Sequence, residues 1–351
     1  MSLLGYTRFL QGDNTEAGTL YERALELHRA NGNRAGEAHV GSLQGILMRT
    51  CGRLAEAGEH YERALALYQD LHLRAGEHAM IGNLGIVRTA QGRFAAGRER
   101  YERQLGLARE IGHRQGEAAA LVNLGTLVAY LGAPHEGRKH LLRALEIVRE
   151  AGLLRIEFYA LYELGEVAEE MGDRAAMRSR FDEALTLARE IRLTVGVALA
   201  MEGLGFVFAE AGETAAARTY LEEARTLAAG TGAVETEVLA CCTLALLPGG
   251  DAGPALAALA AHIERMPAHD LLKARHVLWR ATGDRSHLAD AKRVLDELVA
   301  NSPEECRQAM IANVPLHRDV AIASGDGASV SELSDLSPTV EIKLPSEKPA
   351  P

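Results

Sequence analysis

A fixed step of forty residues runs through most of the chain and constrains its fold more than any other feature. Three kinds of position share this step. They are a glycine (Gly5, Gly45, Gly85, Gly125, Gly165 and Gly205), a second glycine (Gly12, Gly52, Gly92, Gly132, Gly172 and Gly212) and a large residue (Tyr21, Tyr61, Tyr101, Leu141, Phe181 and Leu221). Periods of this length are typical of arrays in which one structural unit stacks on the next.

Each unit has the pattern of two helices. In the first complete unit, residues 34–51 are predicted to be helical, and Gly52 follows with the left-handed conformation that ends a helix at little cost. Residues 54–71 form the second helix, with Tyr61 on its apolar face. The short connection makes the two helices antiparallel. The sequence therefore predicts an all-α chain.

The glycine that lies in the middle of each first helix needs an explanation, because it costs about 0.5–1 kcal/mol relative to alanine. Six such glycines in register indicate that the second helix of each unit packs closely on the first. A large residue such as Tyr61 then fills the space between one pair and the next. We interpret all these positions as core.

The unit resembles the tetratricopeptide repeat. Counted from Ala38 as the first position, Gly45 is the eighth, Ala57 the twentieth, Tyr61 the twenty-fourth and Ala64 the twenty-seventh, which are the small, small, aromatic and small positions of that repeat. The length resembles the long variant found in kinesin light chains and LGN-type polarity adaptors. The resemblance implies a right-handed superhelical solenoid of antiparallel helix pairs, with six forty-residue units over residues 1–240 and a truncated first unit.

Residues 241–323 are predicted to be degenerate helical repeats that cap the C-terminal end of the array. The run from Leu278 to Asp284 and the run from Asn313 to Arg318 resemble the end of the tetratricopeptide region in large bacterial regulators, where the repeats follow an NTPase, kinase or cyclase domain. This resemblance implies an alternative function, a sensor or regulatory arm of a larger signalling protein.

The two ends of the chain carry further expectations. Gly5 is a mid-helix glycine, so Met1 falls inside the first helix of its unit and the apolar edge there has no cap. We expect either more chain upstream or self-association through this edge. Residues 324–351 are rich in Ser, Gly, Asp, Glu, Lys and Pro and are predicted to be a disordered tail, within which residues 339–344 have the alternation of a short docking strand.

Composition excludes several classes of partner. The formal net charge is −10 and the sequence pI is about 5.8, which argues against nucleic acid. No N-terminal signal and no run of eighteen apolar residues occurs, so we expect no membrane association and a cytoplasmic location. The four cysteines, Cys51, Cys241, Cys242 and Cys306, have no zinc-type spacing and are interpreted as reduced thiols.

Motifs for catalysis are missing from the sequence. It contains no phosphate-binding glycine loop, no nucleophile elbow and no His-Glu-x-x-His helix. The thirteen histidines are scattered over different helix faces. We therefore expect neither an enzyme nor a cofactor or metal site, and the main hypothesis is a non-enzymatic scaffold for protein–protein interaction.

A partner protein or peptide is expected to bind in the concave groove, which the first helix of each unit lines with residues at i, i+4, i+7 and i+11. Asn83 and Asn123 occupy equivalent positions in successive units. In the kinesin light-chain and LGN-type relatives, a ladder of asparagines at this position holds the bound peptide. Leu43, Glu163 and Gly203 depart from that pattern, so the ladder has only two members here.

An acidic row follows the asparagines along the predicted groove and has two interpretations. It favours a partner with a basic segment, because like charges three and four residues apart repel each other, or it is a solvated helix face. Aromatic residues beside the acids favour the first interpretation. The predicted partner-binding residues are Asn83, Asn123, Tyr130, Tyr159, Tyr162, Glu163, Glu166, Glu170, Phe206 and Glu210.

Overall fold

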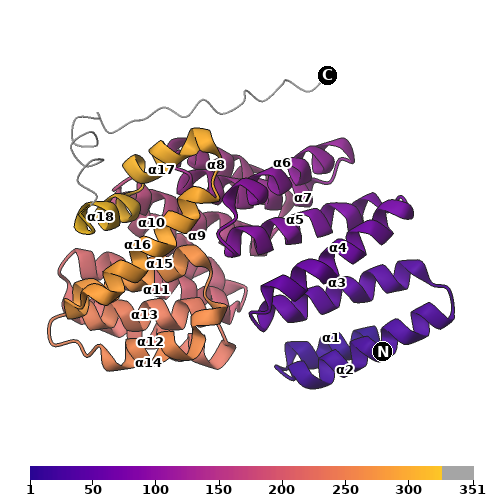
Figure 1. Ribbon diagram of the computed structural model, residues 1–351, viewed down its shortest axis with the longest axis horizontal. Coiled ribbons are helices and arrows are strands. Elements are labelled where there is room, and N and C mark those ends of the chain that lie inside the picture. The colour runs from indigo at the N-terminus through magenta and orange to yellow at the C-terminus, as the bar shows by residue number, and fades with distance from the viewer. Residues whose placement is uncertain (326–351) are drawn as a thin grey trace. The chain divides into compact units, whose positions relative to one another are not determined.

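The computed structural model describes residues 1–325, and within this range the chain forms α-helices, two short 3-10 helices and no strand (Figure 1). The all-α prediction is confirmed. The predicted disordered tail at 324–351 lies outside the described residues from 326 onward, as does the docking strand predicted at 339–344.

The helices alternate between a first and a second helix of each unit, which we call helix A and helix B. The helices A are α1 (Ser2–Leu10), α3 (Arg34–Thr50), α5 (Arg74–Ala90), α7 (Arg114–Tyr130), α9 (Leu154–Glu170), α11 (Thr194–Glu210) and α13 (Val234–Leu246). The helices B are α2 (Asn14–Ala30), α4 (Leu54–Asp70), α6 (Phe94–Glu110), α8 (Pro134–Ala151), α10 (Arg174–Glu190), α12 (Thr214–Thr231) and α14 (Gly253–His262). The remaining helices are α15 (Ala268–Thr282), α16 (Arg285–Ala300), α17 (Arg307–Asn313) and α18 (Pro315–Ala323).

The turns after the helices A follow the predicted glycine register. All six glycines of the second series have positive φ, from 67° at Gly172 to 91° at Gly132. The turns after the helices B have glycine at the equivalent place in most units, but His72 and Arg192 adopt the same left-handed conformation at φ 54° and 55°. These glycines therefore recur every forty residues because the backbone needs a left-handed residue between antiparallel helices.

The mid-helix glycines are explained by close packing within each pair. A Cβ atom at Gly45 would overlap the ring of Tyr61, and one at Gly165 would overlap the ring of Phe181. The Phe181 ring also lies against Gly203 of the following helix A. The large residue of each helix B is thus accommodated by glycine, which offsets the helix-propensity cost of that glycine. The predicted close approach is confirmed.

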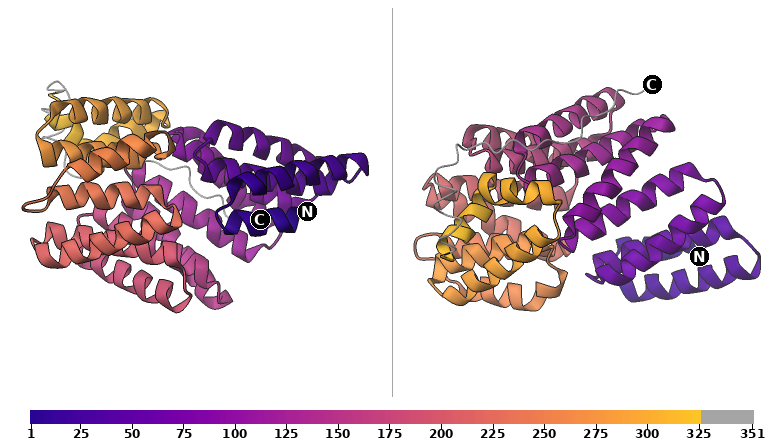
Figure 2. Two further views of the ribbon diagram at one scale, coloured as in Figure 1. Left: turned by 90° about the horizontal axis from the view of Figure 1, so that it is seen from below. Right: turned by 45° about the horizontal axis from the view of Figure 1, so that its top comes forward.

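The chain divides into two compact units, which are described separately. The first comprises Met1–Gln91 and Ala96–Ala120, and the second comprises Gly92–Ala95 and the chain from Leu121 onward. In the first unit, consecutive helices such as α3 and α4 lie antiparallel and side by side (Figures 1 and 2). Its core includes the fully buried Tyr61 packed with Ile81 and Leu84 of α5.

The second unit contains the helices whose pattern is degenerate. The predicted boundary at residue 240 lies inside α13, which pairs with both α12 and α14. The chain then returns along α15–α18 to helices near the start of this unit. The Asn313 amide donates a hydrogen bond to the Gly132 carbonyl at 2.7 Å, and the Ala95 N–H donates one to the Asn301 carbonyl at 2.9 Å. These bonds hold the last helices against the turns at residues 92 and 132.

Candidate functional site

The face of α9 and α11 that points away from the helices B is covered by the chain's own helix α15. Lys273 of α15 donates a hydrogen bond to Glu169 at 2.9 Å, and its Nζ lies 3.9 Å from Glu166. The same ammonium group lies 5.0 Å from the centre of the Phe206 ring of α11. Only 13% of the Lys273 side chain is exposed. The chain itself therefore supplies a cation to the acidic row, the ammonium group of Lys273.

Lys273 lies in a cluster of carboxyl groups. Burial raises the pKa of Glu163 and of Glu202 to about 8 and that of Asp270 to about 7. Burial also raises the pKa of Glu166, against the opposing effect of Lys273 and of a hydrogen bond with Tyr162. Glu163 accepts a hydrogen bond from Thr126 at 2.9 Å. Near neutral pH, part of the cluster is therefore protonated, which limits the repulsion around one Lys.

Aromatic side chains hold α15 at its other end. The Tyr130 and His269 rings are stacked with centroids 3.8 Å apart, and His317 of α18 lies edge-on to His269 at 5.7 Å. Burial lowers the pKa of His269 well below its ordinary value and that of His317 to about 4, so both imidazoles are neutral at physiological pH. Neutral rings fit this contact better than two charged ones.

A cleft of about 360 Å³ remains between α9, α11, α15 and α18. The acids Glu166, Glu169, Glu170 and Glu210 line one side of it, which we call the acidic wall. Across from them, α15 and α18 contribute His269, Lys273, His276, Arg280, Pro315, Leu316, Arg318 and Asp319. Burial raises the pKa of Glu170 to about 8. The volume falls at the lower end of the range for ligand pockets.

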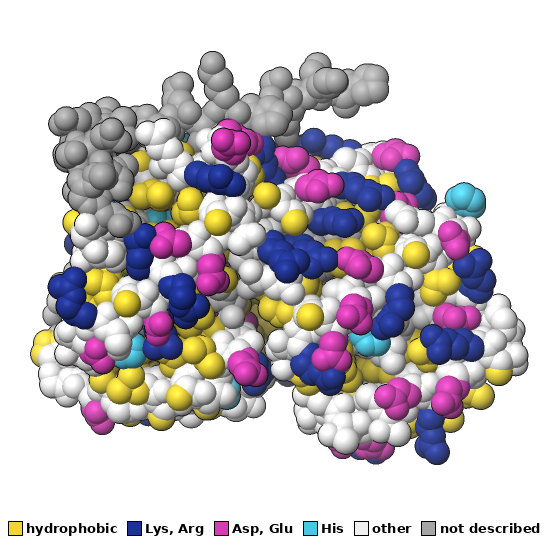
Figure 3. All heavy atoms as spheres, viewed as in Figure 1, with side chains coloured by type: hydrophobic (Ala, Val, Ile, Leu, Met, Phe, Trp, Pro, Cys, Tyr) yellow, Lys and Arg dark blue, Asp and Glu magenta, His cyan; other side chains and the backbone are white. Residues whose placement is uncertain are grey.

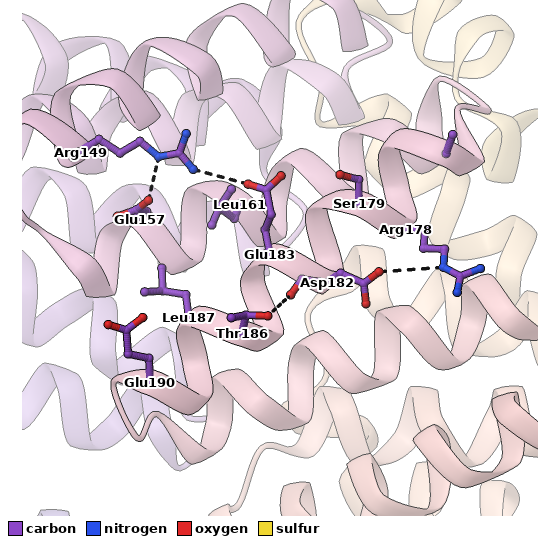
Figure 4. A pocket seen from close by; sticks show the side chains of 11 residues that line it. Arg149, Glu157, Leu161, Arg178, Ser179, Asp182, Glu183, Thr186, Leu187 and Glu190 are labelled. Atoms are coloured by element: carbon purple, nitrogen blue, oxygen red, sulfur yellow. Dashed lines mark hydrogen bonds and ion pairs between the residues drawn. The ribbon is translucent and has the colours of Figure 1, made fainter.

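A second, shallower hollow lies over α8, α9 and α10 (Figure 4). Its two guanidinium groups point at carboxylates of the same hollow: Arg149 pairs with Glu157 at 2.8 Å and with Glu183 at 3.5 Å, and Arg178 pairs with Asp182 at 3.9 Å. These paired charges offer less to a ligand than the cleft does, so the cleft is the better candidate site.

The predicted site residues separate into three groups. Glu166, Glu170, Phe206 and Glu210 line the cleft. The second group comprises Tyr130, Tyr162 and Glu163, which lie next to the cleft and support it through His269, Glu166 and Thr126. The third comprises Asn83, Asn123 and Tyr159, which do not line it. Asn83 belongs to the first unit, whereas Asn123 belongs to the second.

The sequence-based prediction missed the side of the cleft formed by α15. His269, Lys273, His276 and Arg280 recur at i, i+4, i+7 and i+11, which is the same spacing that the prediction used for the helices A. A polar stripe with this spacing on a helix in an apolar segment was the available signal. The interpretation of residues 241–323 as a cap alone leaves this stripe without a role.

Within residues 1–325, no group of three or more His, Cys, Asp or Glu side chains has an arrangement that fits a metal ion. No helix in that range combines the length and apolar character that crossing a membrane needs. On the face drawn in Figure 3, acidic and basic side chains are interspersed over the helices.

Comparison with known families decides the classification. The profile of the tetratricopeptide repeat matches residues 1–70, 77–150 and 157–229, which is more than half of the chain. The chain belongs to the tetratricopeptide-repeat family. The predicted family is therefore confirmed, and the helix pairs described above are tetratricopeptide repeats. No curated protein matches the sequence.

Solved structures with a similar fold share little sequence with this tetratricopeptide-repeat chain. The Rap conjugation gene regulator of plasmid pLS20, in complex with the Phr* peptide, aligns with a TM-score of 0.65 at 13% identity, over 80% of this chain and 77% of that one. A Rap protein complexed with competence and sporulation factor gives 0.61 at 13% identity, over 84% and 76%. A signal-transduction ATPase with a tetratricopeptide-repeat sensor from Pyrococcus horikoshii gives 0.51 at 14% identity, over 95% and 48%.

Proposed function

We propose that this protein is a non-enzymatic scaffold that binds a segment of a partner protein or peptide in the cleft between α9, α11, α15 and α18. The observation that carries the proposal is the acidic wall, where Glu166 and Glu169 share Lys273, Glu210 pairs with Arg174 at 3.4 Å, and Glu170 is left over. A cationic side chain of the partner would lie on Glu170, whose carboxyl has no ion pair within the described residues, and would leave Lys273 in place.

The solved structures support peptide binding by the same fold. Two of the similar proteins were solved with bound peptides, the Rap regulator with Phr* and NprR with its cognate peptide NprX. Another is named as an aspartyl phosphate phosphatase from Bacillus subtilis. A binding role fits this cleft better than catalysis through a hydroxyl or thiol nucleophile, because no Ser, Thr or Cys side chain lines it.

A peptide array tests this proposal. Each octapeptide is displayed with one Arg and again with Ala in its place, and binding of the full chain is measured. At pH 8.5, where Glu170 is ionised, we expect the protein to prefer the Arg forms. We expect Glu170→Gln to weaken their binding about tenfold, since a charge-assisted contact in a cleft is lost. Glu190→Gln, an exposed acid of α10, is the matched control and should change nothing.

Equal binding of the Arg and Ala forms would contradict the proposal. So would a loss of binding in Glu190→Gln as large as in Glu170→Gln. Circular dichroism of each variant shows whether the fold is retained, which separates loss of the cleft from loss of the structure.

The sensor-arm hypothesis is a second candidate. The chain aligns over 95% of its length with an ATPase that has a tetratricopeptide-repeat sensor, and it spans 48% of that protein. Immunoblotting of the native protein, with an antibody raised against this chain, measures its mass in the cell. A band well above 37.7 kDa supports the larger regulator, and a band at that mass contradicts it.

Self-association through the N-terminal edge stays a prediction. Leu3 and Leu10 of α1 are 78% and 66% exposed. Sedimentation velocity at two protein concentrations, repeated with Leu3→Glu, measures whether the chain forms oligomers through these side chains. A monomer at both concentrations would contradict the prediction.

A further inference from the structure

Two histidine side chains of the first unit lie against each other. His78 of α5 is only 4% exposed, and its ring lies edge-on to the ring of His113, with centroids 5.2 Å apart and planes at 69°. Gly116 of α7 makes room for both rings, because a Cβ atom there would overlap each of them. His78 Nε2 and His113 Nδ1 are closed to solvent, and within the described residues neither makes a hydrogen bond of ordinary geometry.

His113 also stands at the start of α7. It directly precedes the helix, and its carbonyl accepts a hydrogen bond from the Glu117 N–H at 2.9 Å. Asn33 has the equivalent place before α3, and its side chain accepts a hydrogen bond from the Gly36 N–H at 2.8 Å. A neutral imidazole nitrogen can accept such a bond, whereas a protonated one cannot, and the positive end of the helix dipole disfavours a cation. A positive charge on the two rings would therefore cost free energy at this end of α7.

The carboxylates nearest to this contact along the chain are already paired. They are Glu77, which is next to His78 on α5, and Glu117, in the first turn of α7. Their partners are Arg74 and Arg103 for Glu77, both at 3.1 Å, and Arg109 and Arg114 for Glu117, at 3.2 and 3.4 Å. On the side of α4, the ionisable group is Tyr68, and a phenol is uncharged at neutral and acid pH. A proton on the rings would therefore have no unpaired carboxylate beside it.

We propose that His78 and His113 form an acid-sensitive contact, which holds the start of α7 against α5 at neutral pH and releases it as the pH falls. Burial lowers the pKa of His78, and the neighbouring His113 adds to this effect, against an opposing effect of the Gly116 backbone. The unfolded state therefore binds more protons than the folded state below about pH 6.5. The stability that this contact contributes is complete above that pH and is lost as the pH falls through the lowered pKa.

Hydrogen exchange of the full chain at pH 7 and at pH 5, corrected for the intrinsic exchange rate, tests this inference. In the wild-type chain, α5 and residues 114–120 should open more often at pH 5. The increase from one histidine is at most about thirtyfold, because pH 5 lies about 1.5 units below the ordinary pKa of 6.5. His78→Phe keeps a ring that cannot be protonated, and it should reduce the increase at least about threefold.

His39→Phe is the matched control, because His39 is an exposed histidine of α3 in the same unit. It should keep the full increase of the wild-type chain. Burial also lowers the pKa of His60 of α4, so acid can loosen this unit at a second place. The difference between His78→Phe and the wild-type chain isolates the contribution of the histidine contact.

His113→Asn is a second variant, since asparagine supplies the helix cap that Asn33 gives to α3. If circular dichroism shows that His78→Phe does not fold, His113→Asn decides, and it should reduce the acid-induced increase about twofold or more. An equal increase in the wild-type chain and in the deciding variant would overturn the inference. So would wild-type exchange in α5 and residues 114–120 that is the same at pH 7 and pH 5.

Discussion

The two units share the way in which helix A packs on helix B, but they differ in the residues on the outer faces of their helices A. In both, a mid-helix glycine of helix A accommodates a large residue of helix B, as with Gly45 and Tyr61 in the first unit and Gly165 and Phe181 in the second. The positions of the helices A that face away from the helices B differ. In the first unit, α5 carries the half-buried Asn83, whereas α9 of the second unit carries an acidic row.

This difference shows that the repeat register fixes the packing of pairs and leaves the surface of the helices A free to vary. In the second unit, that freedom is used to place carboxyls against a helix from more than one hundred residues further along the chain, since Lys273 and Glu169 are 104 residues apart.

The largest expected effect is a loss of stability in the second unit that the first unit does not share. Lys273→Met leaves Glu166 and Glu169 without their cation and should lower the free energy of unfolding of the second unit by roughly 3 kcal/mol. Hydrogen exchange followed by mass spectrometry should show faster exchange in α9 and α15 and no change in α3 and α4.

Lys292→Met is the control for that substitution. Lys292 pairs with Asp296 on α16, and the Asp296 side chain is 60% exposed, so losing this pair should cost about 1 kcal/mol or less. Equal effects of the two substitutions would remove the distinction between the interior cation and an ordinary surface ion pair.

The shared framework predicts equal effects in the two units. Gly45→Ala and Gly165→Ala each force a Cβ into an aromatic ring and should each cost about 2 kcal/mol. Gly106→Ala is the control, because its Cβ would meet no atom within 4 Å and alanine favours a helix; it should stabilise the chain slightly. Urea unfolding measures all three. A harmless substitution at Gly45 or Gly165 would contradict the packing explanation of the forty-residue step.

A pH dependence is expected in the second unit. Burial raises the pKa of Glu163, Glu170 and Glu202 to about 8, so between their unfolded pKa and pH 8 the folded state binds more protons than the unfolded state. Lowering the pH from about 8 to about 6.5 should therefore stabilise this unit by roughly 1–2 kcal/mol for each of these carboxyls that titrates independently. Below that, His269 and His317 oppose the gain, because their lowered pKa values make the unfolded state bind more protons.

The first unit supplies the comparison for this experiment. The shifted groups of its α3–α4 pair are His60, with a lowered pKa, and Tyr61, with a raised pKa, and neither shift makes the group titrate between pH 6.5 and 8. Hydrogen exchange at both pH values, corrected for the intrinsic exchange rate, should show added protection in α9, α11 and α15 and none in α3 and α4. Equal change in both units would contradict the assignment to the buried carboxyls.

The smallest effect is expected at the two asparagines. Asn83→Ala and Asn123→Ala remove amides that do not line the cleft, so each should change the binding of Arg-containing peptides by about twofold or less. Anisotropy with the peptides selected on the array measures this. A loss of tenfold or more in either variant would show that the predicted asparagine ladder takes part in binding.

The fold could be predicted from the sequence because its determinants are local and repeated. The turn glycines and the packing of Gly45 on Tyr61 follow from conformational and steric rules that act within one unit. The acidic row could be predicted for the same reason, since helical spacing alone places Glu163, Glu166 and Glu170 on one face.

What covers that face could not be predicted from the repeat register. The return of α15 depends on the break at residues 248–250 and on contacts such as Asn313 with Gly132, which join segments 181 residues apart. The spacing of His269, Lys273, His276 and Arg280 showed that α15 has a polar face, but no local rule paired that face with α9.

The central claim is that Lys273 of α15 neutralises the acidic face of α9 and so forms one side of the cleft. A double-mutant cycle with Glu169→Gln and Lys273→Met, read from urea unfolding of the full chain, measures the coupling between the two residues directly. We predict a coupling energy of about 1 kcal/mol or more, against nearly zero for the exposed pair of Arg293 and Glu297. Additive effects of Glu169→Gln and Lys273→Met would contradict the claim.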